Sequence, residues 1–296
     1  MIMRILGSHY CGQVLLVCLL VVASACDAKA CTLWGVAGTN AAGGTIIAKN
    51  RDWEPDHMQV LKMSRAGKGY ACFGLYAEGG TEPGIKEGVN EKGLTVITAS
   101  AGSIPKSMRD NQPGKRGIIS KLLSGCADCD EVLTRKDSIF PGARAGFVMI
   151  ADRKKILMVE VGLEGKYTVE VVENGTVAHS NHFLDERLSE FNMKIGKSSA
   201  TRLARVSRLI KLPAQSFNTE SFAVISRDQH DGPDNSLWRT GRNARTLSSW
   251  IVETPQSGSP KLSVVLANPG QPEETRAFVL DPKFWCQKGS ALNNTQ

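Results

Sequence analysis

Cys31 stands directly after a segment that resembles the end of a removable leader. Ala28-Lys29-Ala30 is a small-x-small sequence of the kind that signal peptidases cut. A cut after Ala30 would make Cys31 the first residue of the mature chain and give it a free α-amine. Free α-amines have a pKa of about 7.7–8 and thiols one of about 8.5, so such an amine can accept a thiol proton near neutral pH. This arrangement predicts a cysteine nucleophile that attacks a carbonyl carbon without a distant histidine.

A carboxylate lies within reach of that amine if the first strands form a hairpin. Gly43-Gly44 predicts a turn, and the β-branched run that follows it predicts a strand ending at Lys49-Asn50-Arg51-Asp52-Trp53. The far end of such a hairpin returns beside its start, so we expect Asp52 near the amine of Cys31. A carboxylate there would orient the amine and stabilise its ammonium form. Taken alone, the same residues also fit a charged turn after a strand.

Residues 1–30 have the composition of a secretory signal peptide. Arg4 gives a positive start, and an apolar run from Val14 to Ala25 follows it. This run is short for a membrane-spanning helix, which needs about 20 apolar residues. We therefore expect residues 31–296 to form one secreted or periplasmic domain without stable membrane insertion. The alternative is lipidation at Cys26, as in bacterial lipoproteins, which would leave Cys31 internal unless a second cut followed.

Composition and charge indicate a globular protein. Of the 296 residues, 42% are hydrophobic and 22% are charged, which is ordinary for a folded domain with a large core. The formal net charge of +7 includes two basic residues and one acidic residue of the leader, so the mature chain carries +6. The basic residues are scattered except for Arg202 to Arg208. A solvated basic surface is favoured, and no nucleic-acid partner is expected.

The mature chain retains an odd number of cysteines. They are Cys31, Cys72, Cys126, Cys129 and Cys286. An odd count in an exported protein suggests one free thiol, and Cys31 would be that thiol if the other four paired. The pair Cys126-x-x-Cys129 resembles a redox motif, but its helical context favours a structural disulfide or loose thiols.

The predicted elements do not alternate as strand and helix. Strands are expected over 31–37, 45–48, 60–63, 71–76, 93–99, 145–150, 156–161, 167–172, 262–267 and 277–280. Helices are expected over 117–133, broken near Gly125-Cys126, over 198–212, capped by Ser198 or Ser199, and over 218–226. Residues 102–116 are expected to be a surface loop. This order predicts a layered α+β domain and argues against a doubly wound parallel sheet.

Several segments together resemble a known family. Five segments are similar to the choloylglycine hydrolase and penicillin V acylase group. Three of them are Cys31-Thr32 behind a removable leader, Lys49-Asn50-x-Asp52-Trp53 and Gly88-Val89-Asn90-Glu91-Lys92-Gly93-Leu94. The other two are the His179 and Ser198 segments given in the next sentence. His179-Ser180-Asn181-His182-Phe183 and Ser198-Ser199-x-x-Arg202, with Ser226-x-x-x-His230-Asp231-Gly232 and Leu266-Ala267-Asn268-Pro269, resemble more the isopenicillin-N acyltransferase branch. The resemblance runs from Cys31 to about residue 270.

The resemblance implies an N-terminal nucleophile hydrolase fold, a four-layer αββα sandwich of two antiparallel sheets. It also implies cleavage, or acyl transfer, of linear non-peptide amides through a thioester. By that resemblance, Cys31 is the nucleophile and its amine the base. Asp52 holds the amine, Asn181 donates to the oxyanion, and Arg202 favours the thiolate.

Two residues depart from the bile-salt hydrolase pattern. Lys49 stands where many members have arginine, so it keeps the charge but loses the bidentate fork. Ser100 stands where bile-salt enzymes have a second asparagine. Both remain candidate substrate-binding residues, as does Trp53, which with Phe183 and Trp238 could line an acyl pocket or belong to the core.

No cofactor is expected. The chain has no GxxxxGK[ST] phosphate loop and no HExxH pair. His179 and His182 have no evident third metal ligand, so structural or site-lining roles are favoured.

Three functions stay open. A hydrolase, an acyltransferase in which an amine resolves the thioester, and a catalytically inactive lipid-anchored or secreted binding protein all fit the sequence. The expected partner is a small acyl amide: penicillin V, bile-salt conjugates, acyl-homoserine lactones, N-acyl amino acids and small peptides are all candidates. A homo-oligomer is also open, because related enzymes are often oligomers.

Overall fold

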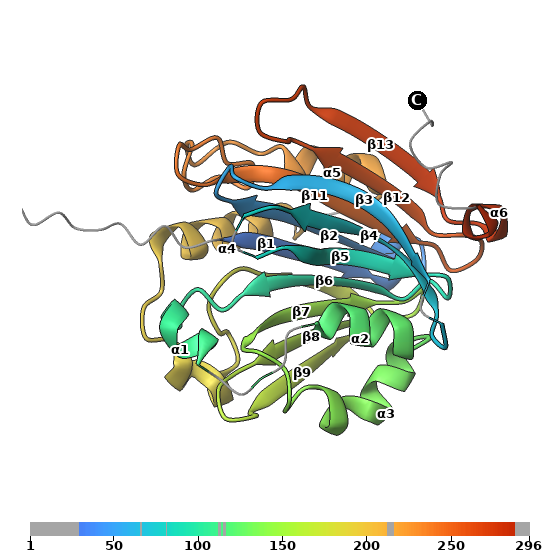
Figure 1. Ribbon diagram of the computed structural model, residues 1–296, viewed down its shortest axis with the longest axis horizontal. Helices are drawn as coiled ribbons and strands as arrows, with labels where there is room; N and C mark the ends of the chain where they lie inside the picture. The colour runs from blue at the N-terminus through green and yellow to red at the C-terminus, as the bar shows by residue number, and fades with distance from the viewer. Residues whose placement is uncertain are drawn as a thin grey trace, which may run out of the picture.

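Two antiparallel sheets stacked face to face form the centre of the protein (Figure 1). The computed structural model describes residues 30–65, 67–80, 82–111, 114, 117–211 and 216–287. The six-stranded sheet has the order β10 (Gly175–His179), β1 (Cys31–Ala37), β2 (Thr45–Trp53), β11 (Arg245–Thr254), β12 (Lys261–Leu266) and β13 (Glu274–Val279). The seven-stranded sheet has the order β3 (Met58–Arg65), β4 (Ala71–Glu78), β5 (Gly84–Asn90), β6 (Thr95–Ser100), β7 (Gly146–Ala151), β8 (Ile156–Val161) and β9 (Tyr167–Val172).

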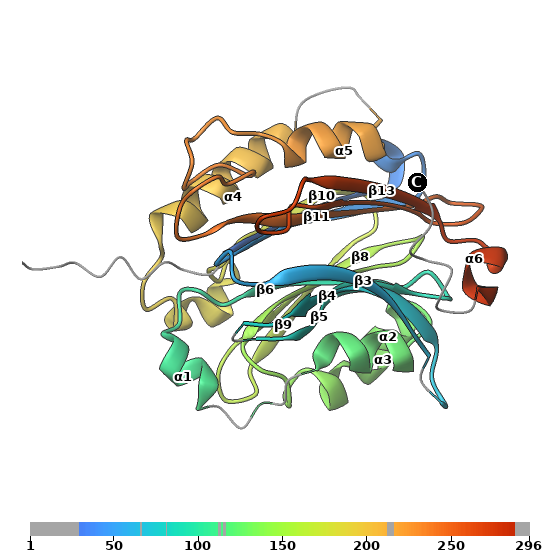
Figure 2. The ribbon, with the colours of Figure 1, turned by 45° about the horizontal axis from the view of Figure 1, so that its top comes forward.

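Helices cover the outer face of each sheet (Figure 2). α4 (Lys197–Leu209) and α5 (Thr219–Ser226) pack on the six-stranded sheet, and α2 (Ile118–Gly125) and α3 (Cys129–Ile139) pack on the seven-stranded sheet. The short helices α1 (Lys106–Asp110) and α6 (Pro282–Cys286) and the 3-10 turns η1 (Gly38–Ala41) and η2 (Glu186–Phe191) complete the described elements. This is the αββα sandwich expected of an N-terminal nucleophile hydrolase, so the predicted fold class is confirmed.

Alternation along β1 decides which side chains face the inside of the sandwich. All seven residues of β1 are buried, because the strand has a sheet on one side and helices on the other. Leu33 joins the apolar core between the sheets, whereas Trp34 packs against α5 through Phe222, with ring centroids 6.0 Å apart. Successive side chains of a strand point to opposite faces. Cys31 therefore shares the face of Leu33 and points between the sheets.

The hairpin of β1 and β2 forms as predicted. Cys31 lies opposite Arg51 in the register, and the backbone N–H of Asp52 donates to the carbonyl oxygen of Ala30 at 3.0 Å. Gly44 at the turn admits no side chain, since a Cβ there would lie 2.3 Å from the carbonyl oxygen of Thr254. The hairpin thus brings Asp52 beside the Ala30–Cys31 peptide bond.

Several elements differ from the sequence expectations. β5, β10 and β11 are strands that the patterns do not predict, and α1 interrupts the expected loop over 102–116. α4 begins after Gly196 without any side-chain cap, so the prediction that Ser198 or Ser199 caps it was wrong. Both serine hydroxyls are instead used elsewhere: Ser198 donates to the carbonyl oxygen of Asp234, and Ser199 contacts residues near Asn181.

The predicted leader, residues 1–30, lies outside the described residues except for Ala30. Cys26 falls in the same segment. Within the described part of the chain, no helix combines the length and apolar character needed to cross a bilayer.

Candidate active site

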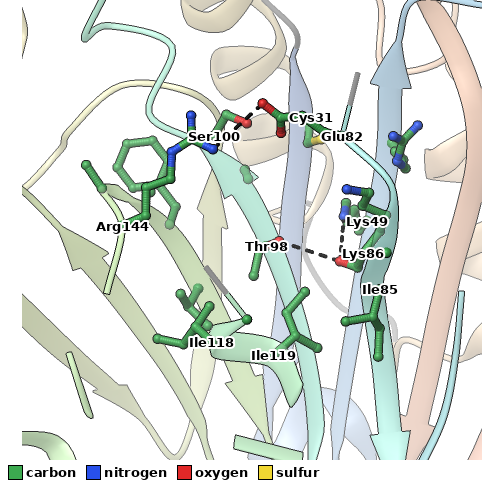
Figure 3. Close-up of a pocket in the computed structure, with 18 of the residues that line it drawn as sticks. Cys31, Lys49, Glu82, Ile85, Lys86, Thr98, Ser100, Ile118, Ile119 and Arg144 are labelled. Atoms are coloured by element: carbon green, nitrogen blue, oxygen red, sulfur yellow. Dashed lines mark hydrogen bonds and ion pairs between the residues drawn. The ribbon is translucent and has the colours of Figure 1, made fainter. Parts of the chain in front are cut away.

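Cys31 opens onto a cavity of about 470 Å³ that is lined by residues of β1, β2, β5, β6 and β7 and by the start of α2. In Figure 3, Cys31 and Ser100 lie at one end of this cavity and Ile118 and Ile119 at the other. Lys49 and Lys86 stand together on one wall, and Arg144 stands across from them. The cavity therefore offers an apolar end for a hydrocarbon group and a charged end at the thiol.

The backbone of Cys31 is held from the opposite side of the sheet. Arg202, on α4 and fully buried, donates from Nη1 to the carbonyl oxygen of Cys31 at 2.8 Å and to the hydroxyl of Thr32 at 2.6 Å. Its Nη2 donates to Oδ1 of Asn181 at 2.8 Å, and the backbone nitrogen of Cys31 donates to the same oxygen at 3.2 Å. Burial lowers the pKa of Arg202, and the charge of Asp52 opposes this shift.

Asn181 connects this network to the seven-stranded sheet. Its Nδ2 donates to the carbonyl oxygen of Ser100 at 3.0 Å, and its backbone N–H donates to the hydroxyl of Ser199 at 3.0 Å. Ser199 also contacts Nδ1 of His182 at 2.8 Å. Burial, together with the charge of His179, lowers the pKa of His182, which keeps Nδ1 able to accept this hydrogen bond. The loop after β10 is thereby fixed on both sides of Asn181.

Asp52 is completely buried next to the start of β1. Its Oδ1 accepts a hydrogen bond from the hydroxyl of Thr246 at 2.7 Å, and Nη1 of Arg239 lies 3.9 Å from Oδ2. Oδ2 has no hydrogen-bond partner among the described residues. Burial raises the pKa of Asp52, while the charges of Arg202 and Arg239 and the hydroxyl of Thr246 lower it. One carboxylate oxygen is thus free to accept a further hydrogen bond beside the Ala30–Cys31 bond.

The three candidate substrate-binding residues, Lys49, Trp53 and Ser100, all line the cavity. Lys49 forms a buried ion pair with Glu87, with Nζ and Oε2 2.5 Å apart. Its charge is therefore already neutralised by the protein, unlike that of a residue reserved for a ligand. Of the four candidate catalytic residues, only Cys31 is among the residues that line the cavity. Asp52, Asn181 and Arg202 are buried around the backbone of Cys31 instead.

The four cysteines other than Cys31 do not pair with one another. All five described cysteines are free thiols, and Cys126 and Cys129 are not joined. Burial raises the pKa of both Cys126 and Cys129, which suits inert packed thiols rather than a redox pair. Cys31 is therefore distinguished by its position at the cavity and not by being the one left unpaired.

Other motif residues have structural roles. Asn50 donates to the carbonyl oxygens of Ser226 and Leu237, each at 2.8 Å, and so ties β2 to the end of α5. Asn90 donates to the carbonyl oxygens of Leu123 and Cys126, each at 2.8 Å, and so ties the end of β5 to the end of α2. His179 contacts Glu160 at 2.9 Å, and Phe183 packs edge-to-face against Phe147 in the core. Among the described residues no group of three or more His, Cys, Asp or Glu side chains is placed to hold a metal ion.

Trp238 lies away from the nucleophile. It lines a second cavity of about 250 Å³, where the guanidinium of Arg227 stacks 3.9 Å from its ring. Trp238 is not among the residues that line the cavity at Cys31, so of the two roles left open by the sequence the structure shows the buried core position.

Sequence reasoning missed four residues of the site: Arg51, Lys86, Arg239 and Thr246. Arg51 occupies the unspecified position of the Lys49-Asn50-x-Asp52 motif, so the resemblance assigns it no role. Arg239 and Thr246 reach Asp52 only through the position of β11 beside β2. Nothing in the sequence indicates that neighbour.

The arrangement can support attack by the thiol on a carbonyl group in the cavity. A carboxylate beside the nitrogen of Cys31 and a buried cation that holds its carbonyl oxygen lie around the reacting residue. The apolar end of the cavity would take the acyl portion of a substrate.

Comparison with known proteins gives a matching family model and two solved structures of similar fold. Residues 39–271 match the family model described as acyl-coenzyme A:6-aminopenicillanic acid acyl-transferase. A mutant of conjugated bile acid hydrolase from Clostridium perfringens aligns with a TM-score of 0.50 at 13% identity, covering 83% of this chain and 92% of that one. A second variant of that hydrolase aligns with a TM-score of 0.51 at 15% identity and the same coverage. No curated protein sequence matches significantly. At these identities the structural likeness shows the fold alone.

Proposed function

The chain belongs to the acyl-coenzyme A:6-aminopenicillanic acid acyl-transferase family, and we propose that it is an exported amidase whose nucleophile is an N-terminal Cys31. The proposed reaction is hydrolysis of a linear carbon–nitrogen amide bond through a thioester. One observation carries the proposal. The side chain of Cys31 lines the cavity while its nitrogen and carbonyl oxygen are fixed by Asn181 and Arg202.

In the first half of the reaction, the α-amine of Cys31 accepts the thiol proton and the sulfur attacks the amide carbon. Asn181 Nδ2 would donate to the oxyanion of the tetrahedral intermediate, a contribution of roughly 3–4 kcal/mol. The ammonium then gives its proton to the leaving nitrogen as the C–N bond breaks, which leaves a thioester on Cys31 and a free amine product.

In the second half, water loses a proton to the α-amine and attacks the thioester. The carboxylic acid leaves and the thiol is restored by the returned proton. Oδ2 of Asp52, which lacks a hydrogen-bond partner in the described chain, would accept a hydrogen bond from the ammonium in both halves. Removal of residues 1–30 is required, because the nitrogen of an internal cysteine is an amide and not a base.

An acyltransferase is the second candidate, favoured by the name of the matching family model. It shares every step up to the thioester and differs only in the acceptor. Product analysis with added amines distinguishes the two, because a transferase forms a new amide in preference to the free acid.

The first test is the intact mass and N-terminal sequence of the exported protein, followed by assays with chromogenic acyl amides. We expect a chain that begins at Cys31 and loses all turnover in Cys31→Ala. Cys286→Ala is the matched control, since it removes an exposed thiol and should leave turnover unchanged. A mature chain that leaves Cys31 internal, or residual turnover in Cys31→Ala, would refute the mechanism. An N-terminal cysteine that no thioester probe labels would favour the inactive binding protein.

A further inference from the structure

Arg51 is placed directly beside the nucleophile. It is the strand partner of Cys31 in the β1–β2 register, and the Cβ atoms of such cross-strand partners lie about 4.5–5.5 Å apart on the same face of a sheet. Both side chains line the cavity, and Arg51 is only 1% exposed. A group bound by its guanidinium would therefore lie within a few bonds of the atom that Cys31 attacks.

The guanidinium of Arg51 has no partner of its own. Neither Nη1 nor Nη2 makes a hydrogen bond within the described chain, and the nearest group recorded for it is the ring of Trp53, 5.0 Å from Cζ. Lys49, two residues earlier on the same face, is by contrast paired with Glu87. Glu87, Asp52 and Asp56 act on its charge through space, but neither Nη1 nor Nη2 is hydrogen-bonded to any of them. A buried guanidinium whose donors are left without acceptors is costly. Such a residue is expected where a ligand supplies the acceptors.

Lys86 adds to the same wall a second cation that makes no ion pair among the described residues. It lines the cavity on β5, beside Lys49 (Figure 3), and its ammonium has no hydrogen bond or ion pair within the described chain. On the opposite wall Arg144 is neutralised by ion pairs with Asp110 and with Glu82. On the wall formed by β2 and β5, Arg51 and Lys86 are thus the cations that make no ion pair within the described chain, whereas Lys49 is paired.

We infer that Arg51 and Lys86 bind an anionic group of the substrate close to the scissile amide. A carboxylate fits best, because a guanidinium can bind its two oxygens through parallel hydrogen bonds. The simplest such substrate is an N-acyl amino acid, whose acyl group would extend toward Ile118 and Ile119. This inference rests on the proposed function, since it names the class of amide that the same site accepts.

The alternative explanation is that the positive charge of Arg51 only stabilises the thiolate of Cys31 and does not contact the substrate. The two roles separate in a protein that has no thiol. In Cys31→Ala no thiolate exists, so any preference for a charged ligand must come from direct contact with the ligand.

The experiment measures calorimetric binding of two probes to the exported Cys31→Ala protein. N-phenylacetylglycine carries a carboxylate, and N-phenylacetylglycinamide is its neutral counterpart of almost the same shape. We expect the charged probe to bind at least about tenfold more tightly, as hydrogen bonds to a charged group allow. Arg51→Gln and Lys86→Gln, each added to Cys31→Ala, should reduce this preference to less than about threefold.

Two further variants serve as controls. Lys154→Gln removes the same charge from an exposed turn and should keep the full preference. Arg51→Lys keeps the charge and should retain part of it, which separates lost recognition from lost folding. Equal binding of the two probes, binding of neither, or an unchanged preference in Arg51→Gln would overturn the inference.

Turnover by the unsubstituted protein then separates the two proposals. One outcome is that Cys31→Ala prefers the charged probe but the unsubstituted protein hydrolyses neither probe. This result would count against the proposed function and not against the anion site. Hydrolysis of both probes at equal kcat/KM would support the proposed function and contradict the anion site.

Discussion

Nη2 of Arg202 donates to Oδ1 of Asn181 at 2.8 Å, and this contact fixes the direction in which the Asn181 amide faces. The nitrogen of Cys31 donates to the same oxygen, so Oδ1 is engaged on the side of β1 and α4. Nδ2 must then face the other way, toward the carbonyl oxygen of Ser100. One cation behind the sheet thereby orients a donor at the end of the cavity where the thiol lies.

Asn181→Ala removes that donor. We expect kcat to fall by roughly 10²–10³ with little change in KM, because a donor to an oxyanion acts mainly in the transition state. Steady-state kinetics of the exported protein checks this. An unchanged kcat in a protein of normal melting temperature would exclude Asn181 from the oxyanion site.

Arg202→Lys keeps the charge but cannot reproduce the four hydrogen bonds that the guanidinium makes. We expect the free energy of unfolding to fall by about 3 kcal/mol, since buried acceptors lose their donor. The activity of the folded fraction should fall at least about tenfold, because Cys31 and Asn181 lose their common support. Denaturant unfolding and kcat measured on one preparation check both effects. Native stability with native kcat would contradict this role.

Thr246→Val removes the hydroxyl that donates to Asp52. That hydrogen bond lowers the pKa of Asp52 against the raising effect of burial, so its loss should raise the pKa further. The carboxylate would then protonate at a higher pH, and the acidic limb of the kcat/KM profile should move to higher pH.

Thr95→Val is the matched control for that change. Thr95 is equally buried, and its hydroxyl has no hydrogen-bond partner within the described chain. Its pH profile should coincide with that of the unsubstituted protein. An identical shift in both variants would show that Thr246 does not act through Asp52.

Lys86 should make the binding of an anionic substrate depend on pH. Burial, with the charges of Arg51 and Lys49, lowers the pKa of Lys86 to about 8, against the opposing charges of Glu82 and Glu87. The ammonium is therefore mostly present at pH 7 and mostly lost at pH 9, so affinity for N-phenylacetylglycine should fall as pH rises through this range. Binding measured on Cys31→Ala at both pH values checks this.

This pH dependence of binding should be seen only with the charged probe, N-phenylacetylglycine. N-phenylacetylglycinamide should bind equally at both pH values, and Lys86→Gln should flatten the response of the charged probe. A fall that persists in Lys86→Gln would assign the titration to another group, such as the α-amine of residue 31.

Asn90→Ala should affect stability and leave chemistry intact. The side chain of Asn90 donates to the carbonyl oxygens of Leu123 and Cys126 and accepts from the backbone N–H groups of Lys92 and Leu94. Losing these contacts should lower the free energy of unfolding by about 3 kcal/mol. The kcat of the folded protein should stay unchanged. A large loss of kcat at temperatures where the variant is fully folded would refute a purely structural role.

The sequence predicted the part of the site in which the candidate catalytic residues lie on strands with a clear apolar pattern. The hairpin that joins Cys31 to Asp52 follows from two apolar strands around a glycine turn, and the structure forms it in that register. β11 escaped prediction because its buried positions include Thr246, Ser248 and Ser249, which look like loop residues. They are buried because each hydroxyl has a specific partner, such as Asp52 for Thr246 and Ser226 for Ser249. Such pairs depend on tertiary contacts that no local pattern carries.

The role of Arg51 was hidden for a different reason. Its position in the motif is the one that carries no expected residue, so the resemblance offered no function for it. Only the cavity and the absence of a partner within the described chain distinguish it from an ordinary surface arginine.

The support of Cys31 by a side chain 171 positions further along the chain also bears on when the thiol becomes able to react. β2, which lies beside β1, needs β11 as its other neighbour, and β11 begins only at Arg245. Contacts of such sequence separation form late and slowly in folding. A nascent or truncated chain would carry the cysteine without the arginine, the asparagine or the threonine that position it. Competence for chemistry is thereby tied to completion of nearly the whole polypeptide, even though the reactive residue is among the first to be synthesised.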